Sequence, residues 1–200
     1  MADARLTHLI KDVLGRDPRI DWDSEKDEAV LSLRREFELG KPGAVLKYVE
    51  TVLARSEYPA SFPRQYSVNY ETASESVVVD ILLPNPGDLG AQVYEEAVFQ
   101  CVLRTFYEVF RSCCIKHVWG CGINGFVSSG EEARCIVSIF AFRNKFDRTD
   151  FAHTETDRAL RALNLRVGGP LAELKPVQPN FRIVSPKKKF VYQKGWVDVE

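Results

Sequence analysis

A chain of 200 residues with 45% hydrophobic and 28% charged residues has the composition of an ordinary globular protein, and it is long enough to bury a core without disulfides or metals. No run of about 18 apolar residues is present, and the N-terminus has neither a basic region nor an apolar leader. These features exclude a membrane-spanning helix, and we expect a cytoplasmic protein with no membrane partner.

Charge is unevenly distributed, although the formal net charge is only −1. Residues 1–100 carry 11 Lys/Arg against 18 Asp/Glu, whereas residues 101–200 carry 16 against 10. This asymmetry either marks an anion-binding face in the C-terminal half, or it brings the two halves together on folding or in a dimer. The five cysteines, of which Cys113 and Cys114 are adjacent, fit reduced thiols better than a disulfide framework.

The first part of the chain, residues 1–57, is a predicted N-terminal helical segment. Apolar residues at helical spacing predict helices over 3–15, from a cap at Asp23 or Ser24 to Gly40, and over about 43–56. The segment Gly40-Lys-Pro-Gly43 ends the second helix and turns the chain. We therefore expect a helical hairpin ahead of the main domain.

The second part, residues 58–170, is the predicted core domain. At Tyr66 the apolar period changes from 3.6 to 2, which predicts a β-hairpin with strands near 66–70 and 77–84. A helix over 91–113 follows, apolar over more than half of its circumference and therefore expected to be covered on most sides. Two further strands, 116–127 and 133–142, and a short helix at about 154–163 complete the domain.

The last part, residues 171–200, is punctuated by prolines and basic, and it reads as an extended arm. The whole order predicts an α+β fold. It comprises an N-terminal helical hairpin, a roughly four-stranded and mainly antiparallel sheet in ββαββ order, one long helix packed on that sheet, and the Pro-rich basic C-terminal arm.

This order of elements resembles the region that precedes the nuclease domain in some Mrr-like restriction endonucleases and related bacterial proteins of anti-phage defence. The matching residues span about 52–186, roughly two-thirds of the chain. They are Val52–Pro63, Val68–Tyr70, Val77–Pro84, Leu103–Phe110, Ile123–Val127 and Glu173–Pro179. The resemblance implies a role in a restriction or defence system, with DNA and a nuclease or ATPase subunit as partners.

The chemistry of a metal-dependent nuclease is not visible in the sequence. Such an enzyme needs a carboxylate on one strand and an acid-x-Lys pair on the next, so that the carboxylates bind Mg²⁺. Asp80 is the one acidic residue within the predicted strands, and Arg143-Asn-Lys145 supplies a lysine without its acid. The resemblance therefore implies a role beside a nuclease rather than nuclease activity, and no cofactor is expected.

Cysteine and histidine residues offer two further interpretations. Cys114, His117 and Cys121 have spacings that a zinc ion accepts, but a structural site needs four ligands and no second clean pair is present. Cys114 or Cys121 could also act as a nucleophile with His117 or His153, given an orienting third group. Buried thiols are the simpler interpretation. The glycines in 120–125 do not open a helix, and they favour a bulge or close strand packing over a phosphate loop.

Basic residues interleaved with aromatic ones are the best candidates for a nucleic-acid contact, because ammonium groups neutralise phosphates and aromatic rings stack on bases. In the arm these basic residues are Lys187, Lys188, Lys189 and Lys194. Arg143, Lys145 and Arg148, near the end of the fourth strand, would extend the same surface.

Three hypotheses remain. In the first, the chain is a non-catalytic accessory module that positions DNA or a partner nuclease. In the second, it is a protein-interaction or homo-oligomerisation module built on the apolar helix 91–113 and the oppositely charged halves. In the third, it is a small enzyme with Cys or His chemistry.

Overall fold

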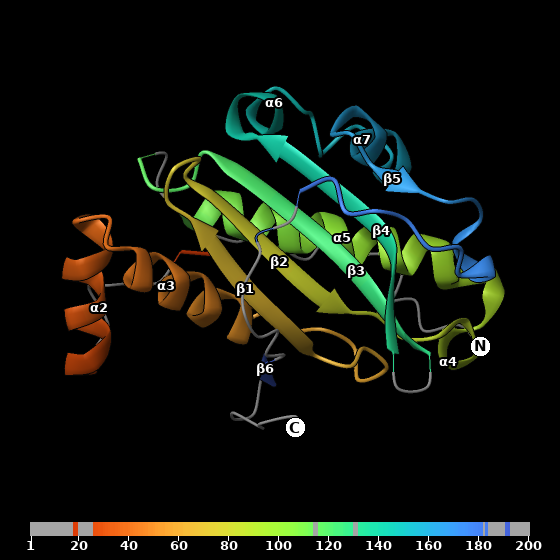
Figure 1. The fold of residues 1–200 in the computed structure, drawn as a ribbon, viewed down its shortest axis with the longest axis horizontal. Coiled ribbons are helices and arrows are strands. Elements are labelled where there is room, and N and C mark those ends of the chain that lie inside the picture. The colour runs from red at the N-terminus through yellow and green to blue at the C-terminus, as the bar shows by residue number, and fades with distance from the viewer. Residues whose placement is uncertain are drawn as a thin grey trace.

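The fold was analysed in a computed structural model that describes residues 18–19, 26–113, 116–129, 132–181, 183 and 191–192. The helix expected over 3–15 lies outside these residues. Within the described residues two helices precede the sheet, α2 (Glu28–Glu38) and α3 (Pro42–Ala54), and they contact each other as a hairpin. Figure 1 shows them at the edge of the molecule next to β1.

The caps of α2 are local in sequence. Asp27 is the N-cap, rather than Asp23 or Ser24, and its carboxylate accepts a hydrogen bond from the Ala29 amide at 2.9 Å. At the other end Gly40 has a φ of 68°, and the amides of Gly40 and Lys41 donate to the carbonyls of Phe37 and Glu36. This is a Schellman ending, which a glycine in the left-handed region makes possible. It confirms Gly40 as the end of the helix.

Six strands form one sheet in the order β5-β4-β3-β2-β1-β6. The strands are β1 (Gln65–Glu71), β2 (Ser76–Leu82), β3 (Gly120–Ser129), β4 (Glu132–Phe142), β5 (Arg166–Val167) and β6 (Val191–Tyr192). All neighbours pair antiparallel except β2 and β3, which are parallel because α5 crosses between them. The four long strands are the predicted ones, whereas β5 and β6 are short additions at the two edges.

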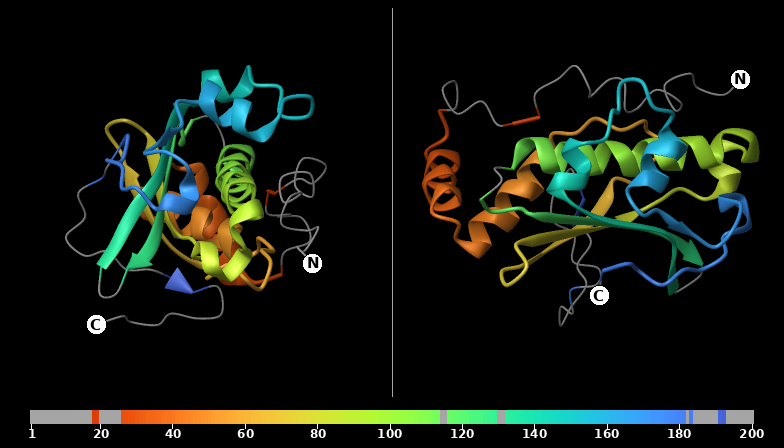
Figure 2. Two further views of the ribbon diagram at one scale, coloured as in Figure 1. Left: turned by 90° about the vertical axis from the view of Figure 1, so that its right-hand side faces the viewer. Right: turned by 90° about the horizontal axis from the view of Figure 1, so that it is seen from above.

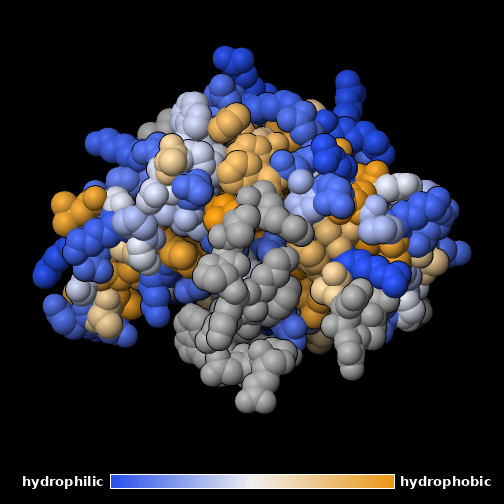
Figure 3. All heavy atoms as spheres, viewed as in Figure 1, coloured by the Kyte–Doolittle hydropathy of each residue, from blue (hydrophilic) through white to orange (hydrophobic). Residues whose placement is uncertain are grey.

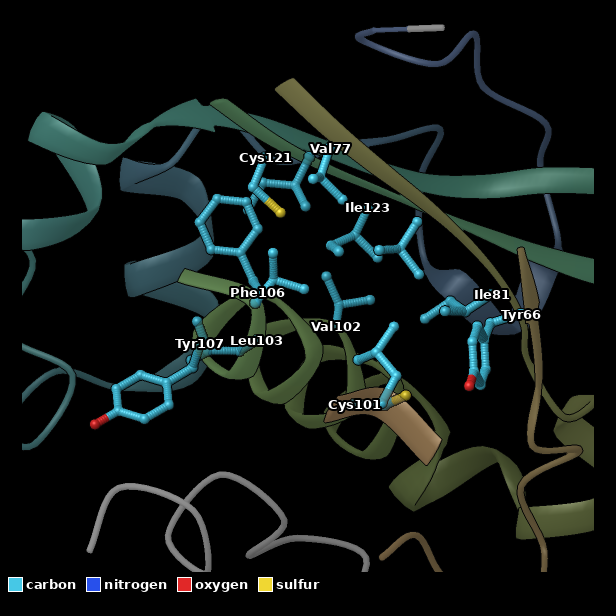
Figure 4. Packing of buried hydrophobic residues seen from close by; sticks show 14 of the residues in the cluster. Tyr66, Val77, Ile81, Cys101, Val102, Leu103, Phe106, Tyr107, Cys121 and Ile123 are labelled. Carbon is cyan, nitrogen blue, oxygen red and sulfur yellow. The ribbon is translucent and has the colours of Figure 1, made fainter. Parts of the chain in front are cut away.

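The long helix α5 (Ala91–Ser112) follows the short helix α4 (Pro86–Leu89) and lies across one face of the sheet. In Figure 2 α5 and its neighbours α3 and α7 (Thr156–Ala162) lie on that same side. Figure 4 shows the contact between the layers, where side chains of α5 such as Val102 and Phe106 face Cys121 and Ile123 of β3. We call this the inner face of the sheet and the opposite one the outer face.

The fold is therefore α+β, with two N-terminal helices and the long helix α5 packed on a mostly antiparallel sheet. Besides β5 and β6, three short elements were not predicted, the helices α4 and α6 (Arg143–Asp147) and the 3₁₀ turn η2 (Leu171–Glu173). Nearly every residue of α5 from Tyr94 to Phe110 is buried inside the chain. The apolar surface of this helix, to which one hypothesis assigned assembly, is thus used within the protein. Among the described helices, none is long and apolar enough to cross a membrane.

Candidate nucleic-acid interface

A row of buried polar side chains crosses the outer face of the sheet. Asp80, Asn124 and Ser138 are register partners on β2, β3 and β4, and each is 5% exposed or less. Asn124 Nδ2 donates to Asp80 Oδ1 at 2.8 Å, and Ser138 Oγ donates to Asn124 Oδ1 at 2.8 Å. Buried polar groups are kept where hydrogen bonds replace the lost water. Asp80 is therefore part of a structural row, in which its Oδ1 accepts a hydrogen bond from the Asn124 amide.

The row ends on the Pro-rich segment 176–181 and anchors it to β4. The amide of Asn180 donates to Ser138 Oγ at 2.8 Å, and Asn180 Nδ2 donates to the carbonyl of Asn164 at 2.8 Å. Further along, the Val177 amide donates to the Cys135 carbonyl at 2.8 Å. Because prolines cannot donate, the non-proline amides make these contacts. The start of the predicted arm thus has a fixed path along the edge of the sheet.

Beside this anchored segment lies a surface hollow of about 650 Å³. Its lining contains two arginines and two asparagines and no acidic side chain. The lining residues are Phe140, Arg161, Asn164, Leu165, Arg166 and Asn180. The volume is within the range of small-ligand sites, and guanidinium and carboxamide groups are donors that suit an anion. We call it the arginine hollow.

The two arginines of the hollow are held by contacts that orient them. Arg161 Nε donates to both carboxylate oxygens of Asp157, one turn earlier on α7, at 2.8 and 2.9 Å, and this partner raises the pKa of Arg161. Arg166 Nη1 donates to the carbonyl of Gln178 in the anchored segment at 3.2 Å. Both side chains are exposed. Asp157 and, at longer range, Glu95 act on the charge of Arg161, while Arg166 and the neighbouring Lys145 add two further cationic groups.

An aromatic ladder adjoins the hollow on the outer face. The ring of Phe140 stacks on Phe181 with centroids 4.7 Å apart, and it meets Phe142 edge-on at 5.3 Å. Phe140 also lies against the glycines of β3, because a Cβ at Gly122 would come within 3.2 Å of its ring. Phe142 remains 46% exposed. Figure 3 views this face and shows apolar residues beside strongly hydrophilic ones over the upper part of the sheet.

The structure separates the three basic residues predicted after β4. Lys145 is at the hollow, since its Nζ donates to Asn164 Oδ1 at 2.9 Å. Arg148 is exposed at the end of α6. Arg143 is only 7% exposed, and its guanidinium donates to the carbonyls of Phe110, Cys113 and Val118 at 2.8 to 3.1 Å. Arg143 caps the C-terminal end of α5 instead of extending a basic surface, so it is not part of the candidate interface.

The basic residues of the arm, Lys187, Lys188, Lys189 and Lys194, lie outside the described residues. The anchored segment 176–181 ends next to the arginine hollow, so the chain enters the arm from this edge of the sheet. The expected contact by these four lysines stays a prediction.

Within the described residues, the cysteine and histidine candidates do not come together in one site. Cys121 is fully buried on β3, and burial raises the pKa of its thiol well above the ordinary value, which disfavours a thiolate. His117 Nε2 lies 3.3 Å from the Glu38 carbonyl, and His153 is exposed and pairs with Asp150 at 2.9 Å. Cys114 lies outside the described residues. Within the described part of the chain, no three His, Cys, Asp or Glu side chains form a metal-binding group.

A second polar cluster lies inside the fold. Arg104 and Glu108, one turn apart on α5, form an ion pair at 3.2 Å with side chains at most 5% exposed, and Ser56 Oγ donates to the same Glu108 oxygen at 2.6 Å. Burial raises the pKa of Glu108, and the Arg104 charge opposes that shift. Arg104 also lies over the ring of Tyr58. The cluster joins the corner that begins at Tyr58 to α5.

The same corner covers an apolar cavity of about 30 Å³. Its lining includes Tyr58, Phe62, Tyr66 and Cys101. A cavity of this size holds about one or two water molecules, which is too small for an organic ligand. The corner is therefore a packing element, and the arginine hollow is the better candidate for a site.

No protein-family model, curated protein or solved structure matches this chain. The site is therefore interpreted from its own residues.

Sequence reasoning missed the lining residues of the hollow, of which the polar ones are Arg161, Asn164, Arg166 and Asn180. A partial signal was present, because Arg161 and Arg166 bracket the end of a predicted helix only five positions apart. Their convergence with Asn180 depends on β5, a strand of two residues that pairs with β4 at Val137 and Ser138. A strand of two residues is too short to show the alternation of apolar and polar residues by which strands are predicted.

Proposed function

We propose that the chain is a non-catalytic accessory module of a restriction or anti-phage defence system, which positions DNA or a partner nuclease. The resemblance of residues 52–186 to the region preceding the nuclease domain of Mrr-like proteins supports the context. The arginine hollow supports the contact with nucleic acid. Phosphates are the common feature of all nucleic acids, and arginines recognise them through paired N–H donors.

The observation that carries this proposal is the position of the hollow at the base of the arm. Arg166 and Asn180 belong both to the lining of the hollow and to the contacts that anchor segment 176–181. A phosphate bound in the hollow would lie next to the start of the segment that carries Lys187–Lys189. Val191, two residues after Lys189, pairs with β1 at the opposite edge of the sheet, so a strand of nucleic acid that contacted both the hollow and the basic residues of the arm would cross the outer face.

The test is binding of a fluorescein-labelled DNA duplex, measured by anisotropy at two salt concentrations. We expect the double substitution Arg161→Ala and Arg166→Ala to weaken binding about tenfold or more, because hydrogen bonds from charged donors are lost. The slope of log K against log salt should become shallower by about 1.8, since each phosphate contact contributes about 0.9. A second variant, with Lys187, Lys188 and Lys189 changed to Glu, should also bind more weakly and less salt-dependently.

A matched control removes the same number of charges elsewhere. Arg34→Ala with Arg35→Ala changes two exposed or half-buried arginines of α2, which lies at the opposite end of the molecule from β5 (Figure 1). This variant should keep at least half of the wild-type affinity. Equal losses in both double variants would mean that binding follows net charge alone, and the hollow would lose its role.

A further inference from the structure

We infer that the arginine hollow and Phe142 together form a site for single-stranded nucleic acid, in which Arg161 and Arg166 bind a backbone phosphate and Phe142 stacks on an unpaired base. This inference rests on the proposed function and specifies its ligand.

The geometry places a phosphate site and a stacking ring in reach of one nucleotide. Phe140 is a wall of the hollow, and Phe142 is the next residue on the same face of β4, with its ring centroid 5.3 Å from that of Phe140. Residues two apart on a strand lie on the same face, about 7 Å from each other. A chain whose phosphate is bound by Arg161 can therefore place its base over Phe142.

The two rings differ in what they can accept. Phe140 is stacked on Phe181 at an interplanar angle of 19° and packed against the β3 glycines, so both of its faces are used. Phe142 has 46% of its surface exposed, which makes it one of three large apolar side chains exposed in the described part of the chain. A large exposed aromatic residue beside a cationic hollow matches the pairing found in single-strand binding surfaces, where bases stack and phosphates meet cations.

Stacking on Phe142 is the interaction by which the site would distinguish a single strand from a duplex. In a duplex each base already stacks on its neighbours and its faces are closed to a protein side chain, whereas the phosphates are open in both forms. The arginines therefore contribute to binding of either form, and Phe142 contributes only to binding of a single strand. This predicts a preference for single strands that depends on one ring.

The experiment compares three fluorescein-labelled probes, an oligothymidine of twelve nucleotides, the oligouridine of the same length, and the thymidine strand paired with its complement. The full chain should bind at least one single strand about fivefold or more tightly than the duplex. Phe142→Ala should remove this preference by weakening only single-strand binding, also about fivefold or more. Phe142→Trp, which keeps a stacking ring, should retain it.

The comparison of the DNA and RNA probes identifies the source of the strand. Tighter binding of the uridine probe assigns the site to RNA, tighter binding of the thymidine probe assigns it to DNA, and equal binding means that the 2′-hydroxyl is not contacted. Each of these results supports the inference if the preference for single strands disappears in Phe142→Ala.

Three results would overturn it. Equal affinity for single strand and duplex, with binding that still depends on Arg161 and Arg166, removes the stacking site and leaves the proposed function standing. Single-strand binding that is unchanged in Phe142→Ala does the same. Absence of binding to all three probes removes this inference and also the contact with nucleic acid in the proposed function. Far-ultraviolet circular dichroism of the variants confirms that they are folded, as expected for an exposed position.

Discussion

Tyr66 shows how one residue connects the corner at Tyr58 with the sheet. Its ring is 6% exposed, and its hydroxyl donates to the Glu50 carbonyl on α3 at 3.1 Å. Burial, with a smaller contribution from the Glu50 charge, raises the pKa of Tyr66 to about 12. The folded protein therefore keeps this hydroxyl protonated at a pH where the unfolded chain has begun to lose the proton.

The shift of Tyr66 predicts a loss of stability in alkali. Its contribution is complete below the unfolded pKa of about 10, and it is lost as the pH rises toward 12, because the unfolded chain then binds fewer protons. Urea unfolding between pH 9 and pH 11.5 should show a free energy of unfolding that falls up to about 1.4 kcal/mol per pH unit more steeply for the wild type than for Tyr66→Phe. Parallel curves for the two proteins would contradict this role.

Arg143 marks the limit of sequence reasoning at the residue scale. Arg143, Lys145 and Arg148 look alike in the sequence, as basic residues after a buried strand. The difference arises because α5 ends beside the start of β3, where the carbonyls of Phe110, Cys113 and Val118 need donors. A planar guanidinium with five donors satisfies all three. That need depends on a contact over 25 to 33 residues of chain, which no local pattern contains.

At the scale of elements, the packing of β4 against β3 requires glycines in β3. The expectation of a bulge or close packing is confirmed, since the register with β4 shifts between Gly125 and Phe126, and Gly120 and Gly122 lie under the ring of Phe140. Glycines within a predicted strand indicate a bulge or a close approach of neighbouring groups. The residue that covers these glycines, Phe140, was readable only as part of a buried strand.

Gly120→Ala tests this packing. A Cβ at Gly120 would lie 2.9 Å from the Phe140 ring and closer still to Ser76 Oγ, so the ring or the strands must move. We expect a loss of about 1–3 kcal/mol in the free energy of unfolding by urea, as for other overpacked sites. Gly87→Ala is the control, because nothing lies within 4 Å of its added Cβ. A stability of Gly120→Ala equal to that of Gly87→Ala would show that the face yields without cost.

At the scale of the whole molecule, the polar row connects the centre of the sheet with the start of the arm. Asp80, Asn124 and Ser138 hold one another in place, and Ser138 presents its hydroxyl oxygen to the amide of Asn180. The α+β order, the hairpin and the long helix could be predicted because each has its own apolar period. The row could not, because Asp80 becomes a neighbour of Asn124 only through the parallel pairing of β2 with β3, and Ser138 joins them through the register of β3 with β4.

Removing the Asn180 side chain at the end of the row should loosen the anchored segment without unfolding the domain. Asn180→Ala deletes the side-chain hydrogen bonds to the carbonyls of Asn164 and Ser138. At about 1 kcal/mol per hydrogen bond, the amides of Val177 and Asn180–Phe181 should exchange with deuterium about fivefold or more faster, while those of β2 and β3 keep their rates. Mass spectrometry of the peptide covering 171–181 measures this, and Asn144→Ala, at an exposed position of α6, serves as the control.

Unchanged exchange in that peptide would mean that the backbone contacts of Val177 and Asn180 hold the segment alone. Faster exchange would instead tie the direction of the arm to a side chain that also lines the arginine hollow, so a ligand there would fix the path of the arm.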